Sequence, residues 1–375
     1  MTSATPPAHA KPPLWARVVA VLLSLVLSLV MAEVVAGIVR HHAFPILNLY
    51  LEDAALGVRL EPSASTHLRS RTGNVTSVRT NRLGFRGDEW RPAAGGVVRG
   101  RVLLLGDSQV FGYGVEEDEA LAAQLQAELG PSFEVLSAAT PSWGPPELAT
   151  VLAELAPIYR PEIVVFVANV ANDWSEVKVP NRLRTTARDG WARTVIANQD
   201  DTVSDFPGRR FLLGKSHLVY ALRTLLRGAP DAAEAALATS ATRLVKDLPW
   251  LAQPDGENRS RLTRVVLRMA DTCKPLGCTL VTAGLPLDVQ VHPSEWQKYR
   301  GEIPIDVGGT YRLLGTLLAE LHQHGLAVLD LLPALRATSP GAFQVDDYHL
   351  SARGHAAIAH ALAPTLRERR PGDRR

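Results

Sequence analysis

Beyond residue 100, the spacing of apolar positions alternates between two patterns. Residues 102–105 form a short continuous apolar run, which is typical of a strand buried on both faces. Leu121, Leu125 and Leu129 follow at the spacing of one helical face. The same alternation predicts strands over 133–136, 163–168, 279–283 and 327–331, and helices over 146–155, 262–272, 311–322 and 355–366. This order predicts an α/β fold, in which helices cover both faces of a parallel sheet of about five strands.

The amino-terminal segment has a different pattern, because its positions from 18 to 39 are almost all apolar or small. The exceptions are Ser24, Ser28 and Glu33. About 20 apolar residues span the hydrocarbon core of a bilayer, so we predict a transmembrane helix over residues 14–40, preceded by a tail of residues 1–13. A removed signal peptide, or a helix buried in the protein core, would show a similar pattern.

Charge sets the expected direction of this helix. The short amino-terminal side carries Lys11 and Arg17 and no acidic residue, which favours a cytoplasmic amino terminus. The rest of the chain would then face the periplasm or the cell exterior. We divide it into a preceding segment over 43–100, a main domain over 101–368 and a basic tail over 369–375. Residues 174–260 are polar and lack clear strands, so we expect a helical insertion there.

Composition argues against several classes of function. A formal net charge of +2, with 21% charged residues, gives no nucleic-acid signature. Cys273 and Cys278 are too few for a zinc site, and they flank a turn that is compatible with either a local disulfide or two thiols. The histidines are scattered, and there is no phosphate-binding loop or dinucleotide fingerprint. We therefore expect neither a metal nor a cofactor.

A serine stands where the first buried strand of the main domain ends, in Gly106-Asp107-Ser108. Polar groups at such strand ends gather at one edge of a parallel sheet. Near the other end of the chain, Asp346 precedes His349 by three residues, and none of the other histidines has an Asp at that spacing. A serine hydroxyl needs a base, and the base needs an anion to orient it. We therefore predict that Ser108 is a nucleophile, His349 its base and Asp346 the orienting carboxylate.

The oxyanion formed by attack on a carbonyl also needs hydrogen-bond donors. The backbone N–H of Ser108 is one candidate. Asn172, just past the third predicted strand, is a second. The loop after the second strand, residues 137–144, is expected to supply another. All three loops follow consecutive strands, so they should lie on the same edge of the sheet.

These motifs resemble the four blocks of the SGNH superfamily, the GDSL esterases and lipases. The first block matches as Gly106-Asp107-Ser108, the third as Ala171-Asn172-Asp173, and the fourth as Asp346-x-x-His349. The second block departs from the family pattern, because Ser142 stands where the oxyanion glycine is expected, and Gly144 is the alternative donor. The resemblance covers residues 79–366 and implies a flavodoxin-like three-layer α/β/α sandwich that hydrolyses esters, often acyl groups on carbohydrates or lipids.

Together these observations predict a membrane-anchored ester hydrolase of SGNH type that works through an acyl-serine intermediate. Its expected partners are an acyl-ester substrate, with a surface glycan or envelope lipid as candidates, and the membrane through the amino-terminal helix. Two alternatives stay open. An O-acyltransferase would use the same triad but pass the acyl group to a sugar hydroxyl, and a non-catalytic envelope protein would keep the fold for binding or assembly.

Overall fold

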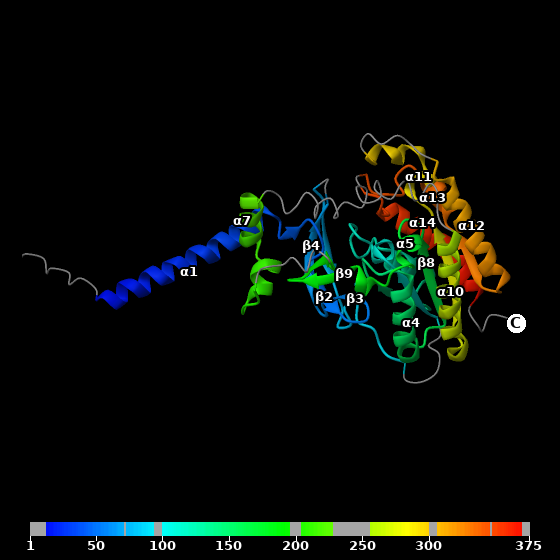
Figure 1. Ribbon diagram of the computed structural model, residues 1–375, viewed down its shortest axis with the longest axis horizontal. Coiled ribbons are helices and arrows are strands. Elements are labelled where there is room, and N and C mark those ends of the chain that lie inside the picture. The colour runs from blue at the N-terminus through cyan, green and yellow to red at the C-terminus, as the bar shows by residue number, and fades with distance from the viewer. Residues whose placement is uncertain are drawn as a thin grey trace, which may run out of the picture.

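The computed structural model describes residues 13–70, 73–93, 100–195, 204–227, 256–299, 306–345 and 347–369. A long helix leads from the amino terminus to a small β-rich unit, which in turn lies against an α/β domain (Figure 1). The helix and the α/β domain follow from patterns in the sequence, and the β-rich unit contacts the loop after β7 through the Val58 carbonyl and the Trp143 indole N–H.

The central sheet has five strands, and every pairing in it is parallel. Its strands are β6 (Arg101–Gly106), β7 (Glu134–Ala139), β8 (Ile163–Asn169), β11 (Thr279–Leu285) and β12 (Ala327–Asp330). The spatial order is β12-β11-β8-β6-β7, the flavodoxin-like arrangement. All five predicted strands are confirmed. The order reverses between β6 and β8, and ligands of such sheets bind at the carboxyl ends of the strands beside that reversal.

Helices form a layer on each face of the sheet. One layer contains α4 (Pro145–Tyr159), α10 (Gly256–Cys273) and α12 (Gly308–Gln323), and the other contains α3 (Leu121–Leu129), α13 (Leu332–Thr338) and α14 (Ala352–Glu368). Side chains of β6 alternate between the two cores: Leu103 packs with the α4 layer and Leu104 with the α14 layer. The predicted three-layer α/β/α sandwich is therefore confirmed. The short helices are α2 (Ser108–Phe111), α5 (Asp173–Glu176) and α11 (Asp288–Val291), with 3-10 turns η1 (Asn181–Leu183), η3 (Lys274–Leu276) and η4 (Pro293–Tyr299).

The β-rich unit combines residues before the main domain with part of the insertion. It contains β1 (Ala43–Phe44), β2 (Tyr50–Asp53), β3 (Gly57–Leu60), β4 (Ser65–Arg69), β5 (Val75–Arg79), β9 (Thr185–Arg188) and β10 (Trp191–Thr194). The Tyr50 N–H donates to the Gly190 carbonyl at 2.9 Å, and the Asn181 side chain donates to the Leu56 carbonyl at 2.9 Å. Segments 43–100 and 174–260 therefore fold together in their described parts.

The described part of the expected helical insertion over 174–260 contains strands as well as helices. Residues 185–194 form the antiparallel pair β9 and β10, whose alternating side chains are too polar to give a clear strand signal. Further along the insertion lie a turn of π-helix, η2 (Phe211–Lys215), and the helix α7 (His217–Arg227). Residues 196–203 and 228–255 lie outside the described ranges.

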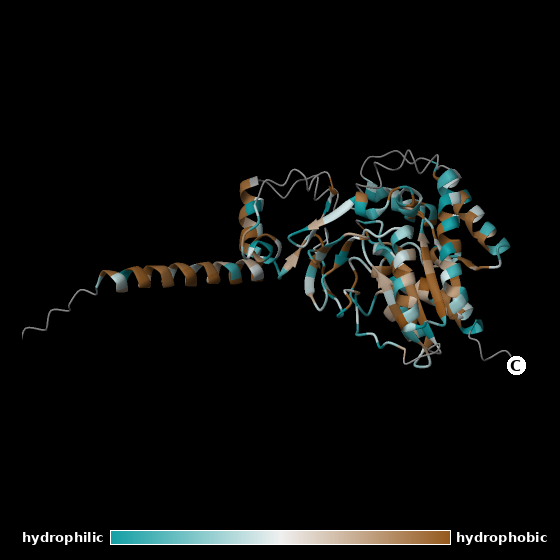
Figure 2. Cartoon of the chain, turned by 60° about the horizontal axis from the view of Figure 1, so that its bottom comes forward, coloured by the Kyte–Doolittle hydropathy of each residue, from teal (hydrophilic) through white to brown (hydrophobic). Residues whose placement is uncertain are grey.

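The amino-terminal helix α1 spans Leu14–Val39, close to the predicted bounds. It is long and apolar enough to cross a membrane, and none of its most apolar stretch is buried against the protein. A place in the protein core is therefore ruled out, and a membrane anchor or a signal sequence remains. In the cartoon of Figure 2, most of this helix has the colour of hydrophobic residues. The tail of residues 1–12 lies outside the described part, and Cys273 and Cys278 are free thiols.

Candidate active site

Ser108 is presented by a tight turn at the carboxyl end of β6. Gly106 ends the strand, and a Cβ there would lie 2.2 Å from a methyl carbon of Val110, so only glycine fits. Asp107 then caps α2, because its carboxylate accepts the Gln109 N–H at 2.9 Å. Ser108 is the first residue of α2, where backbone N–H groups have no acceptor within the helix. The turn thus leaves both its hydroxyl and its N–H available at the reversal of strand order.

His349 reaches this serine from the segment that precedes α14. Its Nε2 lies 2.8 Å from the Ser108 Oγ, although the two residues are 241 positions apart. The Gln109 side chain holds the backbone on both sides of the histidine: it donates to the Tyr348 carbonyl at 3.1 Å and accepts the Leu350 N–H at 2.9 Å. Gln109 was not among the site residues predicted from the sequence. Its position directly after the serine was the one available signal.

The carboxylate beside His349 belongs to Asp347. Its Oδ1 lies 2.9 Å from the imidazole Nδ1 and also accepts the His349 backbone N–H at 3.2 Å. A hydrogen on Nδ1 would leave Nε2 as the acceptor for the serine proton. Asp346, the residue expected in this role, lies outside the described residues. The sequence analysis weighed only a spacing of three, although a carboxylate two positions away can also reach Nδ1.

Two tyrosine rings stack on the His349 imidazole. Tyr113 lies with its ring centroid 5.1 Å away and Tyr348 with its centroid 4.9 Å away. Burial raises the pKa of the Tyr113 hydroxyl, so that it stays protonated at neutral pH. These contacts restrict the rotation of the imidazole and support its alignment between Ser108 and Asp347.

Asn172 lies on the same edge of the sheet, at the start of α5. Its side-chain nitrogen donates to Asp107 Oδ2 at 2.8 Å, and its side-chain oxygen accepts the Tyr348 hydroxyl at 3.4 Å. Asn169 donates to the same Asp107 oxygen at 2.7 Å. Because the amide is held at both ends, its second N–H has a fixed direction and can serve an oxyanion. The structure therefore brings Asn172 and Ser108 together through Asp107.

The two candidate donors of the second sequence block, Ser142 and Gly144, differ in their surroundings. The Gly144 N–H donates to the Glu147 carboxylate at 3.1 Å, which completes the capping of α4 and argues against Gly144 as an oxyanion donor. Ser142 has a φ of +83°, in the left-handed region that favours glycine. Burial raises the pKa of the Tyr50 hydroxyl, and the nearby Ser142 side chain partly offsets that rise. Ser142 thus takes a backbone conformation that favours glycine, and its side chain lies near Tyr50 of the β-rich unit.

The carboxylates of Asp107, Asp173 and Glu176 are buried close to Asn172. Burial, together with the carboxylates of Asp107 and Glu176, raises the pKa of Asp173 well above its ordinary value. Asp173 also accepts the Asn169 N–H at 2.8 Å, so it holds the end of β8 in place. This arrangement suits a structural role in the loop better than proton transfer to a substrate.

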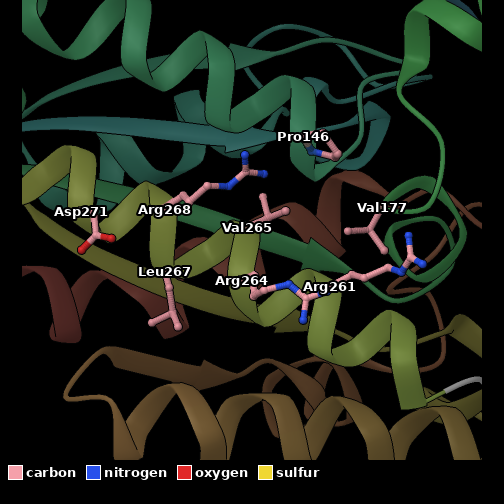
Figure 3. A pocket seen from close by; sticks show the side chains of 8 residues that line it. All are labelled: Pro146, Val177, Arg261, Arg264, Val265, Leu267, Arg268 and Asp271. Carbon is pink, nitrogen blue, oxygen red and sulfur yellow. The ribbon is translucent and has the colours of Figure 1, made fainter.

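The site is distinct from the groove shown in Figure 3, which measures about 540 Å³ and lies between α4 and α10. Three arginines of α10, Arg261, Arg264 and Arg268, line it together with Pro146. Neither Ser108 nor His349 contributes to it. Within the described residues, no group of three or more His, Cys, Asp or Glu side chains could hold a metal ion.

Comparison with known proteins gives matches only to solved structures. No protein-family model matches the chain, and no curated protein matches it. The matching structures are consistently lipases, esterases and acylhydrolases of the GDSL type, the family that the motifs resemble. They include TesA, with 15% identity over 72% of this chain and 99% of that one and a TM-score of 0.38.

Two further structures have similar scores. A GDSL-like lipase from Bacteroides thetaiotaomicron has 9% identity over 72% of this chain and 88% of its own, with a TM-score of 0.37. A lipase/acylhydrolase from Enterococcus faecalis has 14% identity over 72% of this chain and 97% of its own, with a TM-score of 0.38. At such low identities, the activities of these proteins are not assigned to this chain. Its chemistry is argued from its own residues.

The conformation of Ser142 yields a prediction about stability. Ser142→Gly and Ser142→Ala both remove the hydroxyl that contacts Tyr50, but only glycine adopts a positive φ without strain. We expect the glycine variant to exceed the alanine variant by about 1–2 kcal/mol in free energy of unfolding, measured with urea. An alanine variant of equal or higher stability would show that residue 142 does not take the left-handed conformation.

The buried residue His355 yields a prediction about pH. Burial, with the nearby Arg86 guanidinium and His349 side chain, lowers its pKa to about 3. Between pH 6.5 and 3 the unfolded chain therefore binds a proton at this position and the folded chain does not, so the folded state loses stability as the pH falls. When the pH falls from 6.5 to 5, the free energy of unfolding should decrease by about 2 kcal/mol less for His355→Gln than for the wild type. Urea unfolding at the two pH values measures this difference. Equal losses in the two proteins would refute a neutral buried His355.

Proposed function

We propose that this protein is a membrane-anchored serine ester hydrolase that cleaves O-acyl esters through an acyl-serine intermediate. The observation that carries the proposal is the continuous chain of contacts from Ser108 Oγ to His349 Nε2 at 2.8 Å and from His349 Nδ1 to Asp347 Oδ1 at 2.9 Å. A nucleophile held against a base, which is itself oriented by a third group, is the arrangement that covalent acyl transfer needs.

The acylation step follows from this geometry. His349 Nε2 takes the Ser108 proton as Oγ forms a bond to the ester carbonyl carbon, and the carbonyl oxygen becomes an oxyanion. The backbone N–H groups of Ser108 and Ser142 and the side-chain N–H of Asn172 are the proposed donors to that oxyanion. When the tetrahedral intermediate collapses, the bond to the alcohol oxygen breaks, and His349 returns its proton to that oxygen.

Deacylation repeats the step with a different nucleophile. His349 takes a proton from water as the water oxygen attacks the acyl-serine carbonyl, and Ser108 leaves with that proton. Asp347 keeps the imidazole oriented and stabilises its cationic form in both halves of the reaction. A sugar hydroxyl in place of water would give the O-acyltransferase, and an O-acylated envelope glycan or lipid would suit either reaction.

The proposed location follows from α1. Its apolar surface is exposed along its length, and no acidic residue accompanies the basic residues Lys11 and Arg17 on the amino-terminal side. We propose that α1 stays attached as a single membrane span and that the α/β domain faces the periplasm or the cell exterior.

Ser108→Ala tests the nucleophile. In the full-length protein in detergent, we expect the wild type to hydrolyse p-nitrophenyl acetate and to react with a fluorophosphonate probe. The variant should lose probe labelling and at least about 10³-fold in turnover, because the attacking oxygen is gone. Wild-type labelling that needs an added sugar acceptor for turnover would favour the transferase. A folded wild type that neither labels nor turns over would contradict both enzymes and favour a binding protein.

Asp347→Asn, with Asp346→Asn as a matched control, tests the orienting carboxylate. We expect the Asp347 variant to lose on the order of 10³–10⁴ in kcat, because an amide no longer holds the imidazole in the required tautomer. Asp346→Asn removes one negative charge from the neighbouring position and should stay within about threefold of the wild type. Esterase kinetics across pH 6 to 9 will distinguish the two, and the reverse ranking would assign the role to Asp346.

A further inference from the structure

One face of α7 is apolar and exposed. Leu218, Leu222, Leu225 and Leu226 recur at the spacing of a single helical stripe. Leu218 is half-buried, Leu222 is 47% exposed, Leu225 80% and Leu226 81%, so the stripe is most exposed towards the carboxyl end of α7. Exposed leucines clustered in this way mark an interaction surface more often than a chance feature.

Two large apolar residues extend this surface towards the start of α7. Phe211 is 59% exposed and Leu212 is 41% exposed, and both lie in η2, directly before the helix. Together, the α7 stripe and these two residues form what we call the apolar foot.

The opposite side of α7 packs against the protein. This packing turns the apolar foot outward. The His217 ring stacks on Phe44 at 4.4 Å, and the Tyr220 ring lies edge-on to Phe44 at 5.5 Å. The Arg40 guanidinium lies 4.4 Å from the centre of the Tyr220 ring. These contacts join α7 to the carboxyl end of α1 and to the first strand of the β-rich unit.

Glu33, the single acidic residue of α1, fixes the start of α7. Its carboxylate accepts the Ser216 hydroxyl at 2.5 Å, the His217 N–H at 2.7 Å and the Leu218 N–H at 3.0 Å. A carboxylate is well suited to this position, because the first N–H groups of a helix lack partners and carry partial positive charge. An acidic residue that would be costly inside a membrane is here used to attach a second helix to the first.

The position of this attachment along α1 places α7 at a membrane boundary. The stretch from Leu14 to Ala32 precedes Glu33 and is about 28 Å long as a helix, close to the roughly 30 Å of a hydrocarbon core. In both Figure 1 and Figure 2, α7 runs across the direction of α1, beside its carboxyl end. A helix that crosses a membrane span at its exit lies along the membrane surface.

We propose that the apolar foot is inserted at the boundary between headgroups and acyl chains in the outer leaflet of the membrane that α1 spans. This inference rests on the proposed anchoring of α1. The occupant is lipid because the foot continues the exposed apolar surface of α1 at the depth where that surface leaves the bilayer. Helices with a strong apolar stripe and a polar opposite face take this in-plane position.

The insertion would also fix the orientation of the catalytic domain. The Gly214 carbonyl of η2 accepts the Asn48 side chain at 2.8 Å, and the Leu213 carbonyl accepts the Trp191 indole N–H at 3.0 Å. The same β-rich unit reaches the second sequence block through the Val58 carbonyl, which accepts the Trp143 indole N–H at 2.7 Å. A continuous series of packed elements therefore runs from the foot to the loop that carries Ser142.

Depth-resolved fluorescence quenching tests the proposal in the full-length protein. Single cysteines are introduced in a Cys273→Ser/Cys278→Ser background, labelled with the environment-sensitive dye NBD and reconstituted in phosphatidylcholine–phosphatidylglycerol vesicles. Leu225→Cys reports on the foot. Ile158→Cys is the matched control, because Ile158 is an exposed apolar residue (50%) on α4 in the catalytic domain. Val26→Cys, in the middle of α1, reports on the anchor itself.

Lipids that carry a spin label near the headgroup should reduce the Leu225→Cys emission about twofold and leave the Ile158→Cys emission unchanged. Lipids labelled deep in the acyl chain should quench Val26→Cys more strongly than Leu225→Cys. If Val26→Cys is quenched and Leu225→Cys behaves like the control, the foot is not inserted and the anchor stands. If Val26→Cys itself is not quenched, the anchoring proposal fails.

Quenching by aqueous iodide distinguishes a foot that is covered by protein from one that is inserted in lipid. A Leu225→Cys label that is shielded from both iodide and lipid quenchers would mean that protein, such as a second copy of this chain, covers the foot, and would overturn the proposal. Leu225→Glu/Leu226→Glu in the Val26→Cys background provides a second check. In this double variant, quenching of the Val26→Cys label by lipids labelled deep in the acyl chain should be unchanged. A Leu222→Cys label placed in the same double variant should no longer be quenched by headgroup-labelled lipid.

Discussion

The candidate site depends on the two hydrogen bonds of the Gln109 side chain. This residue follows the proposed nucleophile directly, and its amide pairs with the backbone on both sides of His349. The sheet brings the ends of β6 and the segment before α14 to the same edge, but a sheet edge alone would not align two side chains to within a hydrogen bond. A buried amide that must satisfy both its donor and its acceptor imposes that alignment, because leaving either group unpaired would be costly.

A second buried hydrogen-bond network positions Asn172, one of the proposed oxyanion donors. Asp107 caps α2 with one carboxylate oxygen and receives Asn169 and Asn172 with the other. The residue between Gly106 and Ser108 therefore positions an amide that comes from the end of β8. Polar networks of this kind specify a single arrangement when all their members are paired. The proposed nucleophile, its base and Asn172 thus share one set of hydrogen bonds through Gln109 and Asp107.

Part of the fold could be predicted from the sequence. Continuous apolar runs such as residues 163–168 must be buried on both faces, and helices at a 3.6-residue period must cover them, so the parallel sheet follows from local pattern. The strands β9 and β10 could not be predicted in the same way. Their alternation is weak because the β-rich unit is small, and their partners come from residues far away in the chain.

The sequence by itself determined the elements of the sheet, the apolar amino-terminal helix, a serine at a strand end and a histidine shortly before the last helix. Those features depend on hydrophobic periodicity and residue type, which are local. Tertiary structure decided which carboxylate lies against His349, that the Gly144 N–H is engaged by Glu147, and that Glu33 holds α7. Each of these depends on the distance and direction between groups far apart in the chain or on the exact backbone path, and sequence spacing does not fix either.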